Sequence, residues 1–237
     1  MIKPWSLDQI RQSYPLDDEG YLKLAMNSLL VKKGEHVVWI DPGTADFLPS
    51  SLKREYGFEM PQSLEELLLE ADLGVDAITD VIFTHLHFDH GSAAFRRVPG
   101  QIVKRFPRAR YHVLKEHYRY ARHPDGVEAR SFSTVFLKQL DQIHWLEDWS
   151  CDWMSFHVFQ GHTRGMVVPE LRDGEGTVYF ASDLLPMEAF LEPEVYCGYD
   201  LEPDLQIREK QDFLDRMELG SRIILYHDPV RDSIFYS

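Results

Sequence analysis

The sequence has few cysteines, no long apolar run and no excess of positive charge. Cys151 and Cys197 are the two cysteines, and they form no CxxC pair, which excludes a disulfide framework and argues against a thiolate metal site. This composition fits a reducing compartment, so a cytoplasmic protein is expected. No stretch approaches the roughly 18 apolar residues that a spanning helix needs, and residues 1–30 lack the pattern of a secretory signal. A membrane partner is therefore not expected.

The balance of charge is acidic. With 39 acidic and 25 basic residues, the formal net charge of −14 would repel a phosphate backbone. Nucleic acid is therefore not expected as a partner, and an RNA-processing role is disfavoured. No Ser/Gly-rich linker, repeat or low-complexity tract marks a boundary, and an apolar content of 44% can form one large core. A single domain over residues 1–237 is predicted.

Hydrophobic patterning predicts strands towards both ends of the chain and helices between them. Two strands joined at Lys33-Gly34 are expected within residues 21–41. Ser63 and Glu66 form a capping-box pattern that predicts a helix over residues 63–72. Further elements are predicted as strands near 77–83, 110–114, 155–159, 177–182 and 222–226, and as helices near 116–122, 132–140 and 205–219. This order predicts an α/β fold with two sheets covered by helices.

Three imidazoles and a carboxylate lie within six residues at the end of the predicted strand 77–83: His85, His87, Asp89 and His90. Carboxylates resist burial unless they are paired or bound to metal, so packing alone explains this cluster poorly. Alternate residues of an extended segment point the same way, so His85 and His87 can share one ion. Asp89 and His90, where the chain turns towards a helix, can face a second ion.

Four ligands cannot fill two metal sites, so further ligands are expected at other strand ends. His162 follows the strand near 155–159, after Gly161, whose small size would let the backbone approach closely. Asp183 ends the run 177–182, and His227 follows the last predicted strand. Each residue alone is more often an ordinary turn or surface residue, but their joint occurrence in this order predicts a binuclear metal site.

The order His-x-His-x-Asp-His, Gly-His-Thr, Asp and His resembles the metallo-β-lactamase-fold hydrolase superfamily. The resemblance covers nearly the whole chain and includes the run 37–43, which ends in Asp41-Pro42-Gly43. It implies a four-layer αβ/βα sandwich of two mixed β-sheets flanked by helices. Asp41 has two interpretations, as a turn residue or as a hydrogen-bond acceptor that orients a ligand histidine.

The resemblance also implies how the ligands divide between two ions. The first ion would be bound by His85, His87 and His162, the second by Asp89, His90 and His227, with Asp183 bridging them. These ligands suit two zinc ions, with Fe, Mn or Co as alternatives. Two such ions would share a water and lower its pKa towards about 7, giving hydroxide without a protein nucleophile. Asp89 and Asp183 are the candidate catalytic residues. Both would orient the hydroxide, and Asp183 would also protonate the leaving group.

The long spans between His90 and His162 and between Asp183 and His227 are expected to shape the substrate pocket. Residues 196–203 resemble a segment of the lactonase and organophosphate-hydrolase branch, although an aromatic loop packed on the core is an equal interpretation. Three departures from the family pattern are Pro186 in place of a tyrosine of the acyl-homoserine-lactone hydrolases, Arg164-Gly165-Met166 in place of Pro-Gly, and Ser92 in place of a second glycine. Tyr196 or Tyr199 would have to substitute for that tyrosine.

The sequence therefore predicts a dimetal hydrolase that cleaves a small-molecule lactone or related carboxylic ester, and a homodimer is compatible with this. Thioester hydrolysis of the glyoxalase II type and phosphoester hydrolysis are the alternatives, and cleavage of β-lactams is less favoured. A di-iron redox protein uses the same ligands, but such members usually carry a flavin domain. A metal-stabilised scaffold without turnover is a third hypothesis, disfavoured because a scaffold has no need of an open metal position.

Overall fold

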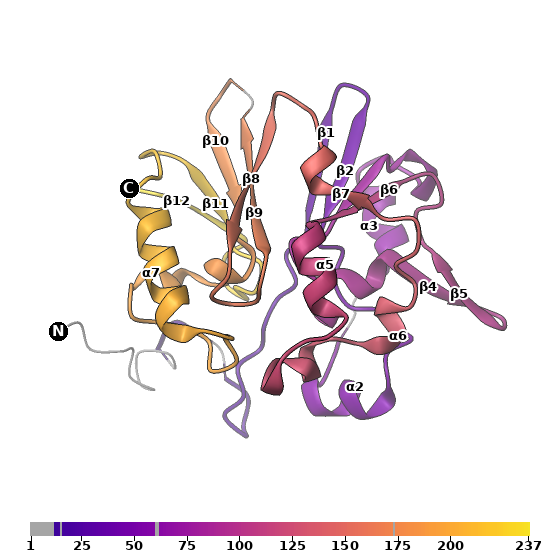
Figure 1. The fold of residues 1–237 in the computed structure, drawn as a ribbon, viewed down its shortest axis with the longest axis horizontal. Helices are drawn as coiled ribbons and strands as arrows, with labels where there is room; N and C mark the ends of the chain where they lie inside the picture. Colours follow the sequence, from indigo (N-terminus) through magenta and orange to yellow (C-terminus); the bar gives the residue numbers. More distant parts are fainter. Residues whose placement is uncertain (1–11, 15, 60–61, 173) are drawn as a thin grey trace. The chain divides into compact units, whose positions relative to one another are not determined.

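The chain divides into two compact units, each with its own β-sheet and its own apolar core (Figure 1). The computed structural model describes residues 12–14, 16–59, 62–172 and 174–237. One unit comprises residues 28–149, and the other comprises residues 150–237 with the segment up to residue 27. Two mixed sheets with helices confirm the predicted α/β class. The prediction of a single domain stays a prediction.

The sheet of the first unit, residues 28–149, contains five strands in the order β1-β2-β3-β6-β7. Their bounds are β1 Leu29–Lys33, β2 His36–Ile40, β3 Asp80–Ile82, β6 Arg110–Val113 and β7 His144–Trp145. The β1–β2 pair is the predicted antiparallel hairpin, and it turns at Gly34, whose φ of 59° favours glycine. The other neighbours are parallel, so the ends of β2 and β3 lie at the same edge. Parallel pairing thus brings Asp41 and the histidine motif to one edge.

Short helices and one hairpin complete the first unit. They are α2 Ser50–Tyr56, α3 Leu64–Glu70, α4 Phe88–Gly91, α5 Lys115–Ala121, α6 Thr134–Leu137, the hairpin β4 Phe95–Val98 with β5 Gln101–Lys104, and the 3-10 turns η1 Val75–Ala77, η2 Ser92–Ala94, η3 Gly126–Ser131 and η4 Leu146–Asp148. The predicted capping box of Ser63 and Glu66 starts α3, and its buried Leu64 and Leu68 face the core one turn apart.

The sheet of the second unit has the order β12-β11-β10-β9-β8. Its elements are β8 Met154–Phe159, β9 Met166–Arg172, β10 Thr177–Phe180, η5 Ser182–Leu184, η6 Glu188–Leu191, α7 Pro203–Leu214, β11 Arg222–Ile224 and β12 Ser233–Phe235. Only β10 and β11 pair in parallel. Phe213 and Leu214 of α7 belong to the core, where the Phe213 ring contacts Phe159 and Tyr179, and α7 lies along this sheet in Figure 1.

Several predicted elements differ from the observed ones. Residues 22–26, which lie within the range 21–41 predicted to contain two strands, form no strand of either sheet. The N–H groups of Ala25 and Asn27 donate to the carbonyls of His227 and Tyr226 instead. The helix predicted near 132–140 is only the four residues of α6, which Ser133 caps. The β4–β5 hairpin and β9 were not predicted. Pro169 lies within β9, and a proline inside an apolar run argues against a strand when the sequence alone is considered. In the described part of the chain, no helix is long and apolar enough to cross a membrane.

Asp80 is a buried carboxylate at the start of β3, and three neighbouring side chains hold it. The carboxylate accepts hydrogen bonds from His112 (2.8 Å), Arg110 (2.9 Å) and Thr79 (2.8 Å). Burial opposes ionisation of this group, but these hydrogen bonds outweigh it and lower the pKa of Asp80 well below its usual range. The charged form is therefore favoured by the fold, and its contribution to stability is present at neutral pH and lost as acid protonates it.

We expect Asp80→Ala to lower the free energy of unfolding by about 3 kcal/mol, because it leaves buried donors without their acceptor. Urea denaturation at neutral pH measures this change. Asp76→Ala, at an exposed position of the same unit, is the control and should change stability by less than about 0.5 kcal/mol. Equal effects of the two substitutions would show that the Asp80 cluster contributes nothing specific.

Candidate metal centre

The first unit brings three of the predicted ligand histidines together. β3 ends at Ile82, and the chain then runs through His85 and His87 into α4, which carries Asp89 and His90. The three imidazoles are almost completely buried, and the His85 ring centroid lies 4.5 Å from that of His87 and 4.0 Å from that of His90. Asp41, His85 and His90 each offer one ligand atom within 4.8 Å of the others. Clustered, buried imidazole and carboxylate groups of this kind suit a divalent metal ion.

Asp41 orients two of these histidines from the end of β2. Its carboxylate accepts hydrogen bonds from His90 Nδ1 (2.9 Å) and from both the N–H and the hydroxyl of Thr84. Because the Thr84 proton goes to Asp41, Thr84 Oγ1 accepts from His85 Nδ1 at 3.0 Å. Burial raises the pKa of Asp41, and the hydrogen bonds from His90 and Thr84 oppose that rise. Asp41 is therefore a hydrogen-bond acceptor that orients a predicted ligand histidine, as the second interpretation of the sequence proposes, and its φ of 46° lies in the left-handed region.

The second unit brings the other three predicted ligands together. His162 follows β8, Asp183 lies in η5 just after β10, and His227 follows β11. The Nε2 atom of His162 lies 3.3 Å from one carboxylate oxygen of Asp183, and the Nε2 atom of His227 lies 3.5 Å from the other. All three residues are at most 3% exposed. Asp183 thus faces an imidazole with each of its oxygens.

Every one of the five histidines donates from one ring nitrogen to an oxygen. His87 Nε2 donates to Glu128 (3.0 Å), His162 Nδ1 to Asp200 (2.7 Å) and His227 Nδ1 to the carbonyl of Ala25 (2.8 Å). With His85 and His90 held by Thr84 and Asp41, all five imidazoles have a defined tautomer. Such partners are what hold metal-ligating histidines in place, because they leave the lone pair on the other nitrogen.

These tautomers make acceptor atoms face one another. His85 Nε2 lies 3.1 Å from His87 Nδ1, and the same arrangement recurs where the two Asp183 oxygens face His162 and His227. Lone pairs at such distances repel unless a proton or a cation lies among them. The chemistry of the donors, imidazole and carboxylate without thiolate, fits a divalent ion such as zinc.

Helix α7 supports the ligands of the second unit from behind. Gln206 donates to the carbonyl of Asp183 (2.9 Å), and Glu209 accepts from the N–H groups of Gln160 and Gly161, directly before His162. Lys210, fully buried, donates to the carbonyls of Glu192 and Val195, in the loop that leads to Asp200. Burial lowers the pKa of Lys210 to about 8. One helix thereby bonds to the backbone directly before His162 and to the backbone of Asp183.

The residues that sequence reasoning missed bond to predicted ligands or to the backbone beside them: Glu128, Asp200, Gln206 and Glu209. Asp200 lies in the segment 196–203, which was noted for its aromatic residues. The carboxylate within that segment could have indicated a partner for a predicted ligand histidine. Glu128 lies in η3 without any motif around it. Only the fold reveals its partner.

The tyrosines of segment 196–203 differ in their surroundings. Both are about half exposed, at 48% for Tyr196 and 47% for Tyr199, but the ring centroid of Tyr199 lies 5.9 Å from that of His162. Pro186, which stands where a tyrosine was expected, contributes its carbonyl to the N–H of His227 at 2.9 Å. Tyr199 is therefore the tyrosine that the second unit places beside a predicted ligand.

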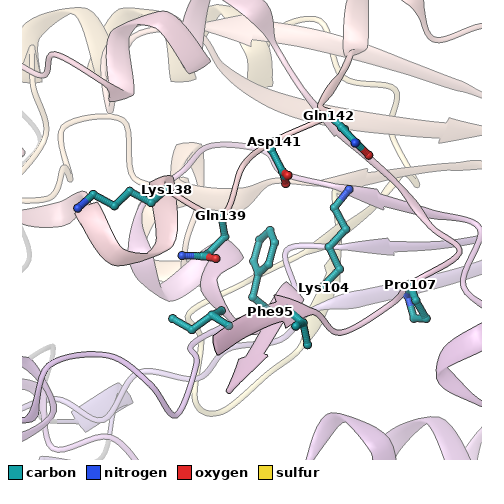
Figure 2. Close-up of a pocket in the computed structure, with 9 residues that line it drawn as sticks. Phe95, Lys104, Pro107, Lys138, Gln139, Asp141 and Gln142 are labelled. Atoms are coloured by element: carbon teal, nitrogen blue, oxygen red, sulfur yellow. The ribbon is translucent and has the colours of Figure 1, made fainter. Parts of the chain in front are cut away.

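A pocket of about 430 Å³ lies elsewhere on the first unit (Figure 2). It is lined by Phe95, Ile102, Val103, Lys104, Pro107, Lys138, Gln139, Asp141 and Gln142, and the Lys104 side chain extends towards Asp141 and Gln142. None of the seven predicted ligands lines it. No histidine lines the pocket, and its carboxylate, Asp141, is not a predicted ligand.

Gly161 allows α7 to approach the loop before His162. A Cβ atom at position 161 would lie 2.4 Å from backbone atoms of Gln206, which cannot move without shifting the helix. We expect Gly161→Ala to destabilise the protein by about 1–3 kcal/mol and to weaken metal binding at His162. Thermal unfolding and metal titration measure the two effects. Gly176→Ala, where no atom lies within 4 Å of the added Cβ, is the matched control, and equal behaviour of the two variants would contradict this account.

The comparisons with known proteins place the chain in a family. The family model described as the metallo-beta-lactamase superfamily matches residues 23–224. A comparison with curated protein sequences gave no significant match.

Solved structures with this fold are similar over most of the chain, although their sequences are distant. A probable metal-dependent hydrolase from Staphylococcus aureus is 20% identical with a TM-score of 0.85, covering 96% of this chain and 83% of its own. AidC, a dizinc quorum-quenching lactonase solved with a product, is 19% identical with a TM-score of 0.75, covering 98% and 83%. The hydrolase AbOPH is 20% identical with a TM-score of 0.72, covering 96% and 80%. At these identities the similarity shows the fold.

Proposed function

Because the chain belongs to the metallo-beta-lactamase superfamily, we propose that it is a metal-dependent hydrolase with two divalent ions, zinc being favoured. The proposed ligands are the seven residues that the sequence predicts: His85, His87, Asp89, His90, His162, Asp183 and His227. The substrate class that we propose is a small-molecule lactone or related carboxylic ester. AidC, a dizinc lactonase of the same fold, supports this choice of metal and substrate.

The observation that carries the proposal is the orientation of the five histidines. Each donates to an oxygen from one ring nitrogen. In His85, His87, His162 and His227 the other nitrogen lies 3.1–3.5 Å from an acceptor atom of another predicted ligand. A structural histidine needs only one such bond and has no reason to face another acceptor. The convergence of acceptors in a buried setting is the arrangement that a cation stabilises.

When bound, two divalent ions would activate water and polarise the substrate carbonyl. The protein's own residues have the remaining tasks. Asp183, buried between two imidazoles of its unit, can accept a proton on a carboxylate oxygen and pass it to the leaving group. Asp89, in the first turn of α4, can orient the attacking water. No other nucleophile is required.

Three aromatic rings beside Asp89 favour a substrate with an apolar part. Phe88, between His87 and Asp89, packs edge-on against Tyr56 (5.4 Å between centroids) and Phe58 (5.7 Å). Tyr56 is 55% exposed. An exposed aromatic ring near a predicted ligand can bind an acyl chain or an aryl group by apolar contact.

The proposed function predicts near two metals per chain and hydrolysis that a chelator abolishes. The purified protein is assayed with lactones, aryl esters, thioesters and phosphotriesters, with and without chelator, while metal stoichiometry is determined. We expect lactones or aryl esters to be the best substrates, and Asp183→Asn to lower kcat at least about 100-fold. Less than one metal per chain after reconstitution and no turnover would rule out the enzyme and favour the scaffold hypothesis.

The aromatic rings predict a dependence on the apolar part of the substrate. Tyr56→Ala should raise KM about tenfold for a long-chain or aryl ester, because apolar contact is lost, and should leave kcat for a short substrate unchanged. Tyr21→Ala, another exposed tyrosine, is the control. If both variants match the unsubstituted protein with every substrate, these rings do not bind substrate.

A further inference from the structure

Glu128 is an almost fully buried carboxylate, 4% exposed, in the η3 turn between the two histidine motifs. One of its oxygens accepts the proton of His87 Nε2 at 3.0 Å, and the other accepts the hydroxyl proton of Tyr120. Tyr120 in turn accepts the N–H of Asp125 at 3.3 Å. The carboxylate is therefore held by both oxygens and has little freedom to turn away from His87.

Phe132 encloses this group with an apolar wall. Its ring lies 4.8 Å from the His87 ring and 6.2 Å from the Tyr120 ring, both edge to face. Phe132 itself is 7% exposed. A charge in such surroundings interacts more strongly with its neighbours than a charge in water does. The electrostatic interaction between the Glu128 carboxylate and the His87 imidazole is therefore little screened by water.

The proposed ligand sets differ in the charge that they supply directly. Apart from Asp183, which is proposed to bridge both ions, the ligands of the first ion (His85, His87 and His162) are neutral, whereas those of the second (Asp89, His90 and His227) include a carboxylate. Carboxylates that accept a proton from ligating histidines raise the basicity of the imidazoles, and this effect matters more where fewer ligands are charged. Glu128 stands behind His87, and Asp200 stands behind His162.

On the basis of the proposed function, we propose that Glu128 is a positioning residue for the metal ion at His85, His87 and His162. It holds His87 with Nδ1 directed at His85 and supplies negative charge from behind the imidazole. Tyr120 maintains the orientation of Glu128. The η3 turn, which no motif marks, thereby sets the affinity of that ion.

Metal affinity, measured by competition with a chromophoric chelator, tests this inference without any substrate. In Glu128→Ala, we expect the affinity for one of two zinc ions to fall about 10–100-fold, because the imidazole loses both its anchor and its charge partner. Glu128→Gln keeps an acceptor but loses the charge, so its affinity for the same zinc ion should fall about tenfold. Tyr120→Phe should lose less affinity for the same zinc ion. The visible spectrum of the cobalt-loaded protein should change in the same three variants.

Glu170→Gln is the matched control, because Glu170 is also a buried glutamate bonded to a histidine, His157, at 2.6 Å, outside the ligand sets. It should bind both ions as the unsubstituted protein does. The inference is wrong, while the proposed function stands, if Glu128→Ala binds two ions with unchanged affinity and an unchanged cobalt spectrum. It is also wrong if Glu170→Gln loses as much metal affinity as Glu128→Gln. If the unsubstituted protein itself binds no metal, both are wrong. Circular dichroism spectra that match the unsubstituted protein establish that the variants fold.

Discussion

The hydrogen bond on one nitrogen of each ligand histidine is the interaction on which the candidate site depends. An imidazole without a partner could rotate or change tautomer, whereas one anchored through Nδ1 or Nε2 presents its other lone pair in one direction. His90 is anchored by Asp41 and His162 by Asp200, both over less than 3 Å. The lone pairs then lie close together in buried surroundings. The free energy of folding of the rest of each unit offsets the repulsion between them.

Backbone geometry at strand ends brings the anchors into place. Asp41 and Ser182, next to β2 and β10, have positive φ values of 46° and 47°, which cost residues other than glycine about 1–2 kcal/mol each. Such conformations persist where neighbouring contacts require them and are frequent at functional sites. Thr84 and His90 impose this requirement on Asp41. Ser182 directly precedes Asp183, the proposed bridging ligand, so both left-handed residues lie beside predicted ligands or the groups that orient them.

The sequence predicts which histidines cluster better than it predicts the groups that bond to them. His85, His87 and His90 are close in sequence, and a strand followed by a turn suffices to gather them, so local pattern was enough. The β1–β2 hairpin and the capping box of α3 are local for the same reason. Glu128 and Asp200 act over sequence separations of 41 and 38 residues, and no local pattern encodes such pairings. The failed strand at residues 22–26 has the same cause, because its backbone bonds to the distant His227 segment.

The central claim is that seven residues hold two metal ions, and a crystal structure of the zinc-loaded protein, with data collected on both sides of the zinc absorption edge, tests it most directly. The account predicts two anomalous peaks, one contacting His85, His87 and His162 and the other contacting Asp89, His90 and His227, with Asp183 contacting both. A protein crystallised with excess zinc that shows no peak at these histidines, or zinc bound only elsewhere, would contradict it.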